Sequence, residues 1–101
     1  MNHTIENQTC NVVFEEGIIS TKVQSLRTFF VELLKKLKEV KNLILDFKEV
    51  NIVDSQGLNF LIGLYVECEK RKIDLKIIHC NSTNRKLFGI FKLDKMLGVE
   101  E

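Results

Sequence analysis

The segment Asp54-Ser55-Gln56-Gly57 holds the residue types in this sequence best suited to chemistry. It joins an apolar stretch that ends near Val53 to a longer one that begins at Leu58. Aspartate and serine commonly precede helices, because their side chains accept hydrogen bonds from free backbone N–H groups. Those N–H groups carry partial positive charge, so a helix that starts here tolerates a phosphate on Ser55. A phosphoserine beside Asp54 would form a strongly negative spot that repels or reorients a bound partner.

Two interpretations of this segment follow from the residues. In the first, Asp54 or Ser55 only caps the helix, and Gly57 allows the helix to pack closely on the sheet. In the second, Ser55 is a phosphorylation site on a partner-binding surface made of Asp54, Ser55, Gln56, Gly57 and Leu58. These four or five residues alone do not decide between a cap and a switch.

No catalytic residue is predicted. A nucleophilic Ser55 needs a base, but the sequence near His79 offers no acid to orient that ring, and Ser55 lacks the flanks of a Gly-x-Ser-x-Gly turn. His79 and Cys80 are neighbours on an expected strand, where successive side chains point to opposite faces and do not form a thiolate pair. We therefore expect a protein that is not an enzyme.

Cys10, Cys68 and Cys80 are odd in number and widely spaced, with no Cys-x-x-Cys pair. This spacing is typical neither of a disulfide framework nor of a zinc site. We expect three reduced, buried thiols, no metal and no cofactor.

The length and charge narrow the class of protein. A chain of 101 residues forms one domain with a single core. A net charge of +1 does not suggest binding to nucleic acid. The N-terminus is polar, and no apolar stretch approaches the roughly 20 residues of a membrane span. We expect a cytoplasmic protein that does not insert into membranes.

The first half of the chain predicts a hairpin, a helix and a strand. Residues 1–8 are expected to be flexible, and the domain to cover residues 9–99. Thr9 to Phe14 is rich in β-formers, and Glu15-Glu16-Gly17 predicts a turn before Ile18-Ile19-Ser20. From Thr21 to Val40 the apolar residues recur every three or four positions, as in a helix capped by Ser20 or Thr21.

The second half predicts two further helix and strand segments. Leu43 to Phe47 is nearly all apolar, which is typical of a central strand. A helix is expected from Ser55 to about Lys72, a strand over Ile73 to His79, and a third helix from Asn81-Ser82 through Phe91. Right-handed crossovers then give an α/β fold: a mixed sheet of four to five strands with helices packed mainly on one face.

The sequence resembles the STAS family, and within it the bacterial anti-sigma factor antagonists. The resemblance rests on the apolar strand Leu43 to Phe47, on Asp54-Ser55-Gln56-Gly57-Leu58, which matches the family pattern Asp-Ser-x-Gly-Leu, and on Leu61-Ile62-Gly63 in a long helix. A strand that ends near Cys80 and a late helix with Arg85-Lys86-Leu87-Phe88 also match. The likeness covers about residues 11 to 99.

The resemblance implies an antagonist that binds an anti-sigma factor with serine kinase activity and thereby frees the sigma factor. The kinase phosphorylates the serine that matches Ser55, and a phosphatase restores it. ATP is then a substrate of the kinase and not a cofactor of this chain. Gly17 is followed by Ile18-Ile19-Ser20, where many family members carry acidic residues, so the identity of the partner stays open.

STAS domains also serve as structural subunits of signalling complexes and as accessory subunits of lipid-transporting ABC systems. In such a role Ser55 is never phosphorylated, and the helix surface from Leu58 to Tyr65 is a permanent interface. This is the alternative function that the resemblance allows.

Overall fold

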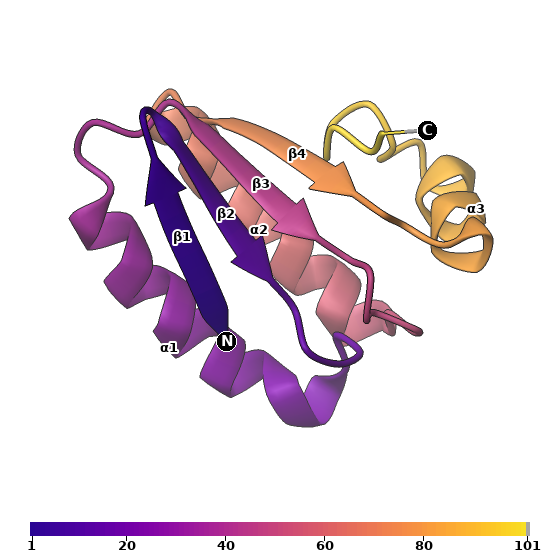
Figure 1. The fold of residues 1–101 in the computed structure, drawn as a ribbon. Coiled ribbons are helices and arrows are strands. Elements are labelled where there is room, and N and C mark those ends of the chain that lie inside the picture. Colours follow the sequence, from indigo (N-terminus) through magenta and orange to yellow (C-terminus); the bar gives the residue numbers. More distant parts are fainter. Residues whose placement is uncertain (101) are drawn as a thin grey trace.

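A computed structural model describes residues 1–100 as a mixed four-stranded sheet with three helices (Figure 1). The elements in chain order are β1 (Asn2–Glu6), β2 (Thr9–Val13), α1 (Ser20–Lys36), β3 (Asn42–Asp46), α2 (Ser55–Lys70), β4 (Asp74–Ile78) and α3 (Ser82–Ile90). The strand order is β1-β2-β3-β4; β1 is antiparallel to β2, whereas β2, β3 and β4 are parallel. The predicted fold class is confirmed.

The connections explain why the two long helices lie on the same face of the sheet. Helix α1 joins β2 to β3 and α2 joins β3 to β4, so both crossovers step across the sheet in the same direction. Right-handed crossovers that step in one direction place their helices on one face. Figure 1 shows α1 and α2 together under the sheet. The helices therefore run parallel to each other, with their N-termini at the edge where the parallel strands end.

The core lies between these helices and the sheet. Alternate residues of the strands face it, as in Cys10 and Val12 of β2 and Leu43 and Leu45 of β3, all of them fully buried. The apolar stripe predicted for the first helix supplies the opposite wall: Val23, Leu26, Phe30, Leu33 and Leu34. Phe14 links the layers, with its ring centroid 5.3 Å from that of Phe47 and 5.9 Å from that of Phe30.

The predicted hairpin is wrong. The chain does not reverse at Glu15-Glu16-Gly17; instead β1 and β2 form the hairpin, with Asn7 and Gln8 between them and Glu6 paired with Thr9. Asn7 has a φ of 57°, a left-handed conformation that asparagine tolerates and that two-residue turns require. Residues 2–6, in the segment expected to be flexible, form an edge strand. All five are exposed, so the sequence lacks the apolar pattern that predicts a strand.

The ends of the helices differ slightly from the prediction. Neither Ser20 nor Thr21 caps α1; Ile19 precedes the helix and makes no side-chain cap, and Ser20 is the first helical residue. Helix α1 ends at Lys36, although Leu37 and Val40 beyond it remain buried. The chain after α3 packs on the domain, with Leu93 and Leu97 buried and Val99 paired with Ile77 of β4.

Candidate functional site

The Asp54 carboxylate caps α2 and also reaches the start of α1. Its Oδ1 accepts a hydrogen bond from the Gly57 N–H at 2.8 Å, which is the geometry of a helix N-cap. Its Oδ2 accepts one from the Ser20 N–H, also at 2.8 Å. Hydrogen bonds from the Gly57 and Ser20 N–H groups hold the pKa of this carboxyl below its ordinary value. One side chain thus joins the N-termini of both long helices.

Gly57 is required where α2 approaches the segment before α1. A Cβ at this position would lie 1.9 Å from the Ile18 carbonyl oxygen. The two segments are also joined by backbone hydrogen bonds, from the Ile18 N–H to the Ile52 oxygen at 2.9 Å and from the Asp54 N–H to the Ile18 oxygen at 3.2 Å. The interpretation that Gly57 allows close packing therefore fits, although the neighbour is the Ile18 backbone.

Ser55 is the first residue of α2, and its side chain is exposed. Within residues 1–100 its hydroxyl makes no hydrogen bond to another side chain or to the backbone outside its own helix, because Asp54 supplies the cap. Gln56 beside it is exposed as well. Of the two residues that the sequence offered as a cap, Asp54 therefore caps α2, and the Ser55 hydroxyl is free.

The loop that precedes Ser55 is held by α3. The buried side chain of Asn84 donates a hydrogen bond from its Nδ2 to the Val50 oxygen at 3.1 Å. Asn81 caps α3 by accepting from the Asn84 N–H at 2.8 Å, and its own Nδ2 lies 3.4 Å from the oxygens of Val50 and Asn51. The sequence of this segment predicts only the start of a helix. The same segment also fixes the loop before Ser55, through hydrogen bonds between residues that are 30 or more positions apart in the chain.

An apolar hollow lies between this loop and α3. It has a volume of about 480 Å³ and is lined by Ile52, Leu87 and Ile90 among others, with Lys86 as its one charged residue. Ile52 is 57% exposed and Ile90 is 75% exposed. Ile52 lies three positions before Ser55 in the chain.

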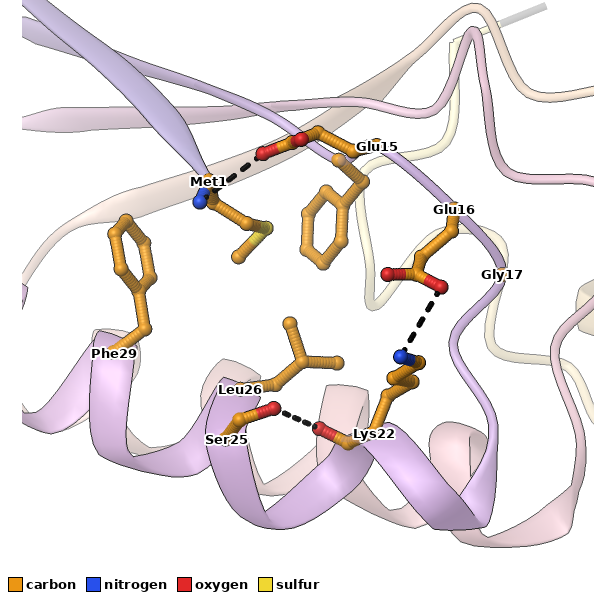
Figure 2. Close-up of a pocket in the computed structure, with 9 residues that line it drawn as sticks. Met1, Glu15, Glu16, Gly17, Lys22, Ser25, Leu26 and Phe29 are labelled. Carbon is orange, nitrogen blue, oxygen red and sulfur yellow. Dashed lines mark hydrogen bonds and ion pairs between the residues drawn. The ribbon is translucent and has the colours of Figure 1, made fainter.

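A second hollow lies on the other side of the α1 start (Figure 2). Its volume is about 230 Å³, and Phe14, Leu26 and Phe29 contribute apolar walls. Glu16 and Lys22 at its rim form an ion pair at 3.4 Å. Figure 2 shows the chain from Glu15 to Gly17 passing over this hollow toward α1, which is the stretch where the predicted turn does not form.

The sequence profile of the STAS domain matches residues 3–101, nearly the whole chain. The chain belongs to the STAS domain family. No curated protein sequence gives a significant match to this STAS domain.

Solved structures share its fold at low sequence identity. The anti-sigma factor antagonist SpoIIAA in its unphosphorylated form matches with a TM-score of 0.68 and 18% identity, over 86% of this chain and 78% of that one. The Bacillus cell fate determinant SpoIIAA in its phosphorylated form matches with a TM-score of 0.72 and 19% identity, over 99% and 90%. The murine anion transporter Slc26a9 in the inward-facing state matches with a TM-score of 0.75 and 20% identity, over 95% of this chain and 16% of the transporter chain.

The residues predicted to form the binding surface divide into two groups in this STAS domain. Ser55 and Gln56 lie on the surface, and Asp54 is half-buried. Gly57 and Leu58 are buried, with Leu58 only 8% exposed and part of the core. Ile52, three positions before Ser55 in the chain, is exposed as well, but an isolated isoleucine in a loop gives no pattern that marks it in the sequence.

His79 has an acidic partner that the sequence did not reveal. Its Nδ1 lies 2.9 Å from Oδ1 of Asp46, because the pairing of β3 with β4 brings the ends of the two strands together. Burial raises the pKa of Asp46, but hydrogen bonds with His79 and with the Lys48 N–H outweigh it, and the pKa lies below its ordinary value. No hydrogen bond within residues 1–100 joins this pair to Ser55.

The three cysteines are free and buried. Burial raises the pKa of the Cys68 thiol to about 12 and that of Cys80 to about 11. Within residues 1–100, no three His, Cys, Asp or Glu side chains are grouped so that they could hold a metal ion. No helix in the described part of the chain is long and apolar enough to cross a membrane.

Proposed function

We propose that this STAS domain is an anti-sigma factor antagonist that binds an anti-sigma factor with serine kinase activity and is switched off by phosphorylation of Ser55. The observation that carries the proposal is the division of roles at the start of α2. Asp54 makes the capping hydrogen bond, so the exposed Ser55 hydroxyl is not needed by the fold. A kinase can therefore modify Ser55 without removing a structural contact.

The two helix N-termini favour a phosphate at this position. The Ser20 and Gly57 N–H groups both bond to Asp54, so the positive ends of α1 and α2 meet beside Ser55. Negative charge near a helix N-terminus is stabilised, typically by 0.3 to about 1 kcal/mol for an exposed group. The domain then stays folded when it is phosphorylated, and only the surface presented to the partner changes.

The partner-binding surface proposed here consists of Asp54, Ser55 and Gln56 with Ile52 and the hollow toward α3. Ile52 and Ile90 supply exposed apolar area, and Ile52 precedes Ser55 by three positions in the chain. Gly57 and Leu58 support this surface from below. A phosphate adds nearly two negative charges next to Asp54, and a partner that accepts the neutral serine is then repelled.

Phosphorylation by the candidate kinase tests the proposal. The purified domain is incubated with a candidate anti-sigma serine kinase and Mg-ATP, and the product is mapped by mass spectrometry. We expect one phosphate, on Ser55, and none on the Ser55→Ala variant. The matched control is Ser20→Ala, which removes the nearby hydroxyl at the start of α1 and should leave phosphorylation unchanged. An unmodified Ser55 after reaction with a kinase that binds the domain contradicts the proposal.

The alternative function is that of a permanent structural subunit in a larger assembly. One observation favours it. The same fold covers 16% of the Slc26a9 transporter chain, so it also occurs as part of a transporter. Copurification separates the two functions. A stoichiometric complex that forms equally with Ser55→Ala and Ser55→Asp supports the structural role, whereas a complex that is lost only with Ser55→Asp supports the switch.

A further inference from the structure

A groove between α1 and α2 lies outside the Ser55 site. It has a volume of about 260 Å³, and its lining includes Arg27, Phe30, Val31, Phe60, Gly63 and Glu67. The rings of Phe30 and Phe60, with centroids 5.7 Å apart, are largely buried beneath it. Val31 at its rim is 55% exposed. The groove is therefore mostly apolar, with polar residues in its lining, and is open to the outside.

Gly63 in the middle of α2 is not explained by the contacts of its own chain. A glycine inside a helix costs up to about 1 kcal/mol relative to alanine. A Cβ at Gly57 would strike the Ile18 backbone, but a Cβ at Gly63 would meet no heavy atom within 4 Å beyond its own helix turn. The absence of a side chain here leaves the α2 backbone accessible in the groove, which suits the close approach of another backbone.

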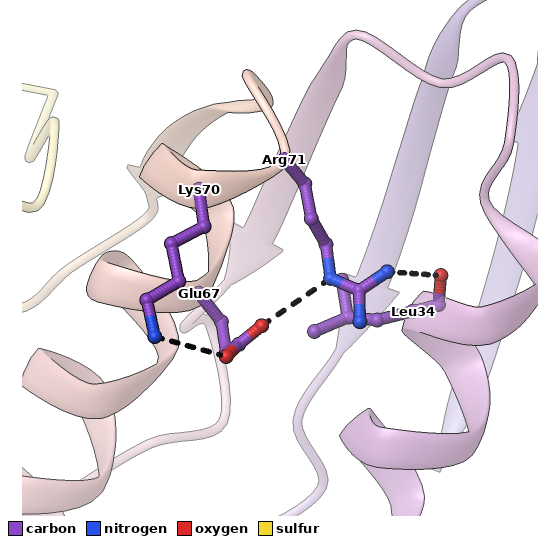
Figure 3. A network of polar contacts seen from close by, with 4 residues as sticks. All are labelled: Leu34, Glu67, Lys70 and Arg71. Carbon is purple, nitrogen blue, oxygen red and sulfur yellow. Dashed lines mark hydrogen bonds and ion pairs between the residues drawn. The ribbon is translucent and has the colours of Figure 1, made fainter.

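The charges of the groove lie at opposite ends. Helices α1 and α2 are parallel, since Ser20 bonds to Asp54 at one end and Arg71 Nη1 bonds to the Leu34 oxygen, at 3.4 Å, near the other (Figure 3). Arg27 consequently lies toward the N-terminal end of the groove and Glu67 toward the C-terminal end. Arg27 forms no ion pair within residues 1–100, whereas Glu67 lies 3.3 Å from Arg71 and 3.9 Å from Lys70.

The charges along this groove are complementary to those of a second, antiparallel copy of the groove. A second copy that lies antiparallel across the groove, related by a twofold axis near Gly63, brings Arg27 of each copy to Glu67 of the other. Twofold interfaces use the same patch on both subunits, so each contact occurs twice. We propose that the groove between α1 and α2 binds a second copy of this chain and forms a symmetric dimer. The proposal does not depend on the switch at Ser55.

Sedimentation velocity over a range of protein concentrations tests the dimer. We expect reversible dimerisation that Gly63→Gln abolishes, because the longer side chain fills the groove. The matched control is Gly89→Gln, which also enters open space but lies on α3, away from the groove. Circular dichroism of both variants verifies that they are folded, as expected for sites without a steric conflict.

A charge exchange tests the pairing itself. Arg27→Glu places like charges together and should weaken dimerisation at least roughly tenfold. The double variant Arg27→Glu, Glu67→Arg exchanges the two charges and should restore most of the affinity, whereas Glu67→Arg alone should weaken dimerisation as Arg27→Glu does. A protein that is monomeric at every concentration overturns the proposal, and so does a dimer that neither Gly63→Gln nor Arg27→Glu weakens.

Discussion

At the scale of single residues, Asp54 and Ser55 are adjacent but have separate tasks. Both oxygens of the Asp54 carboxylate accept backbone hydrogen bonds, from two different helices. Ser55 contributes no contact of this kind and is exposed. A serine placed directly after a strong cap combines an accessible hydroxyl with a fixed backbone.

Acid should weaken the domain through Asp54. Its pKa is lowered in the folded protein, so its contribution to stability is fully present above the unfolded value of about 3.9 and is lost as the pH falls through the lower folded value. We expect the free energy of unfolding of Asp54→Asn, measured with urea, to fall less steeply between about pH 5 and pH 2 than that of the wild type. Equal slopes would show that the two hydrogen bonds do not persist in solution.

Gly57 and Gly89 are both helical but should respond oppositely to alanine. At Gly57 the new Cβ meets the Ile18 carbonyl oxygen at 1.9 Å, and backbone has to move, so we expect a loss of about 3 kcal/mol or failure to fold. At Gly89 the space is open, and alanine should stabilise α3 by up to about 1 kcal/mol. Urea unfolding measures both. Equal stabilities for the two variants would contradict the close contact between Ile18 and α2.

At the scale of elements, the two long helices are parallel neighbours whose ends are joined. Aligned helix dipoles place like partial charges side by side at each end. The N-terminal ends share the Asp54 carboxylate, and near the C-terminal ends the Arg71 guanidinium binds the Leu34 oxygen (Figure 3). An anion at one end and a cation at the other thus offset the repulsion that the parallel arrangement creates.

Loss of the Arg71 cation should cost little but measurable stability. The guanidinium is about half exposed, so we expect Arg71→Gln to lower the free energy of unfolding by about 0.5 kcal/mol. Lys70→Gln is the matched control, because Lys70 contacts Glu67 and makes no bond to α1. High salt should reduce the difference between the two variants. A larger loss for Lys70→Gln would contradict a stabilising contact between Arg71 and the Leu34 oxygen.

The sequence predicts the elements whose pattern is strong and misses those held by distant contacts. The apolar stripe of α1 and the buried strand β3 are evident from spacing alone. Strand β1 has no such pattern, because it lies at the edge of the sheet with every residue exposed. The predicted hairpin is misplaced for another reason. Gly17 is typical of a turn, but here it allows the close approach of Ile52: a Cβ at Gly17 would lie 3.0 Å from the Ile52 oxygen.

At the scale of the whole molecule, the topology brings the site together. Both crossovers step in one direction, and this places the starts of α1 and α2 side by side at the edge where the parallel strands end. The position of Ser55 at a helix start follows from its neighbours in the sequence. The hydrogen bonds from Ser20 to Asp54 and from Asn84 to Val50 cannot be predicted in this way, because each joins residues 34 positions apart in the chain.

The most direct measurement of the central claim is the affinity of the anti-sigma kinase for the domain with and without a phosphate on Ser55. Phosphoserine is incorporated at this single position during synthesis, and binding is measured by calorimetry after circular dichroism has verified an unchanged fold. The account predicts that the unmodified domain binds and that the phosphorylated domain binds at least about tenfold more weakly, a difference of roughly 1.4 kcal/mol. Equal affinities, or a phosphorylated domain that no longer folds, would contradict it.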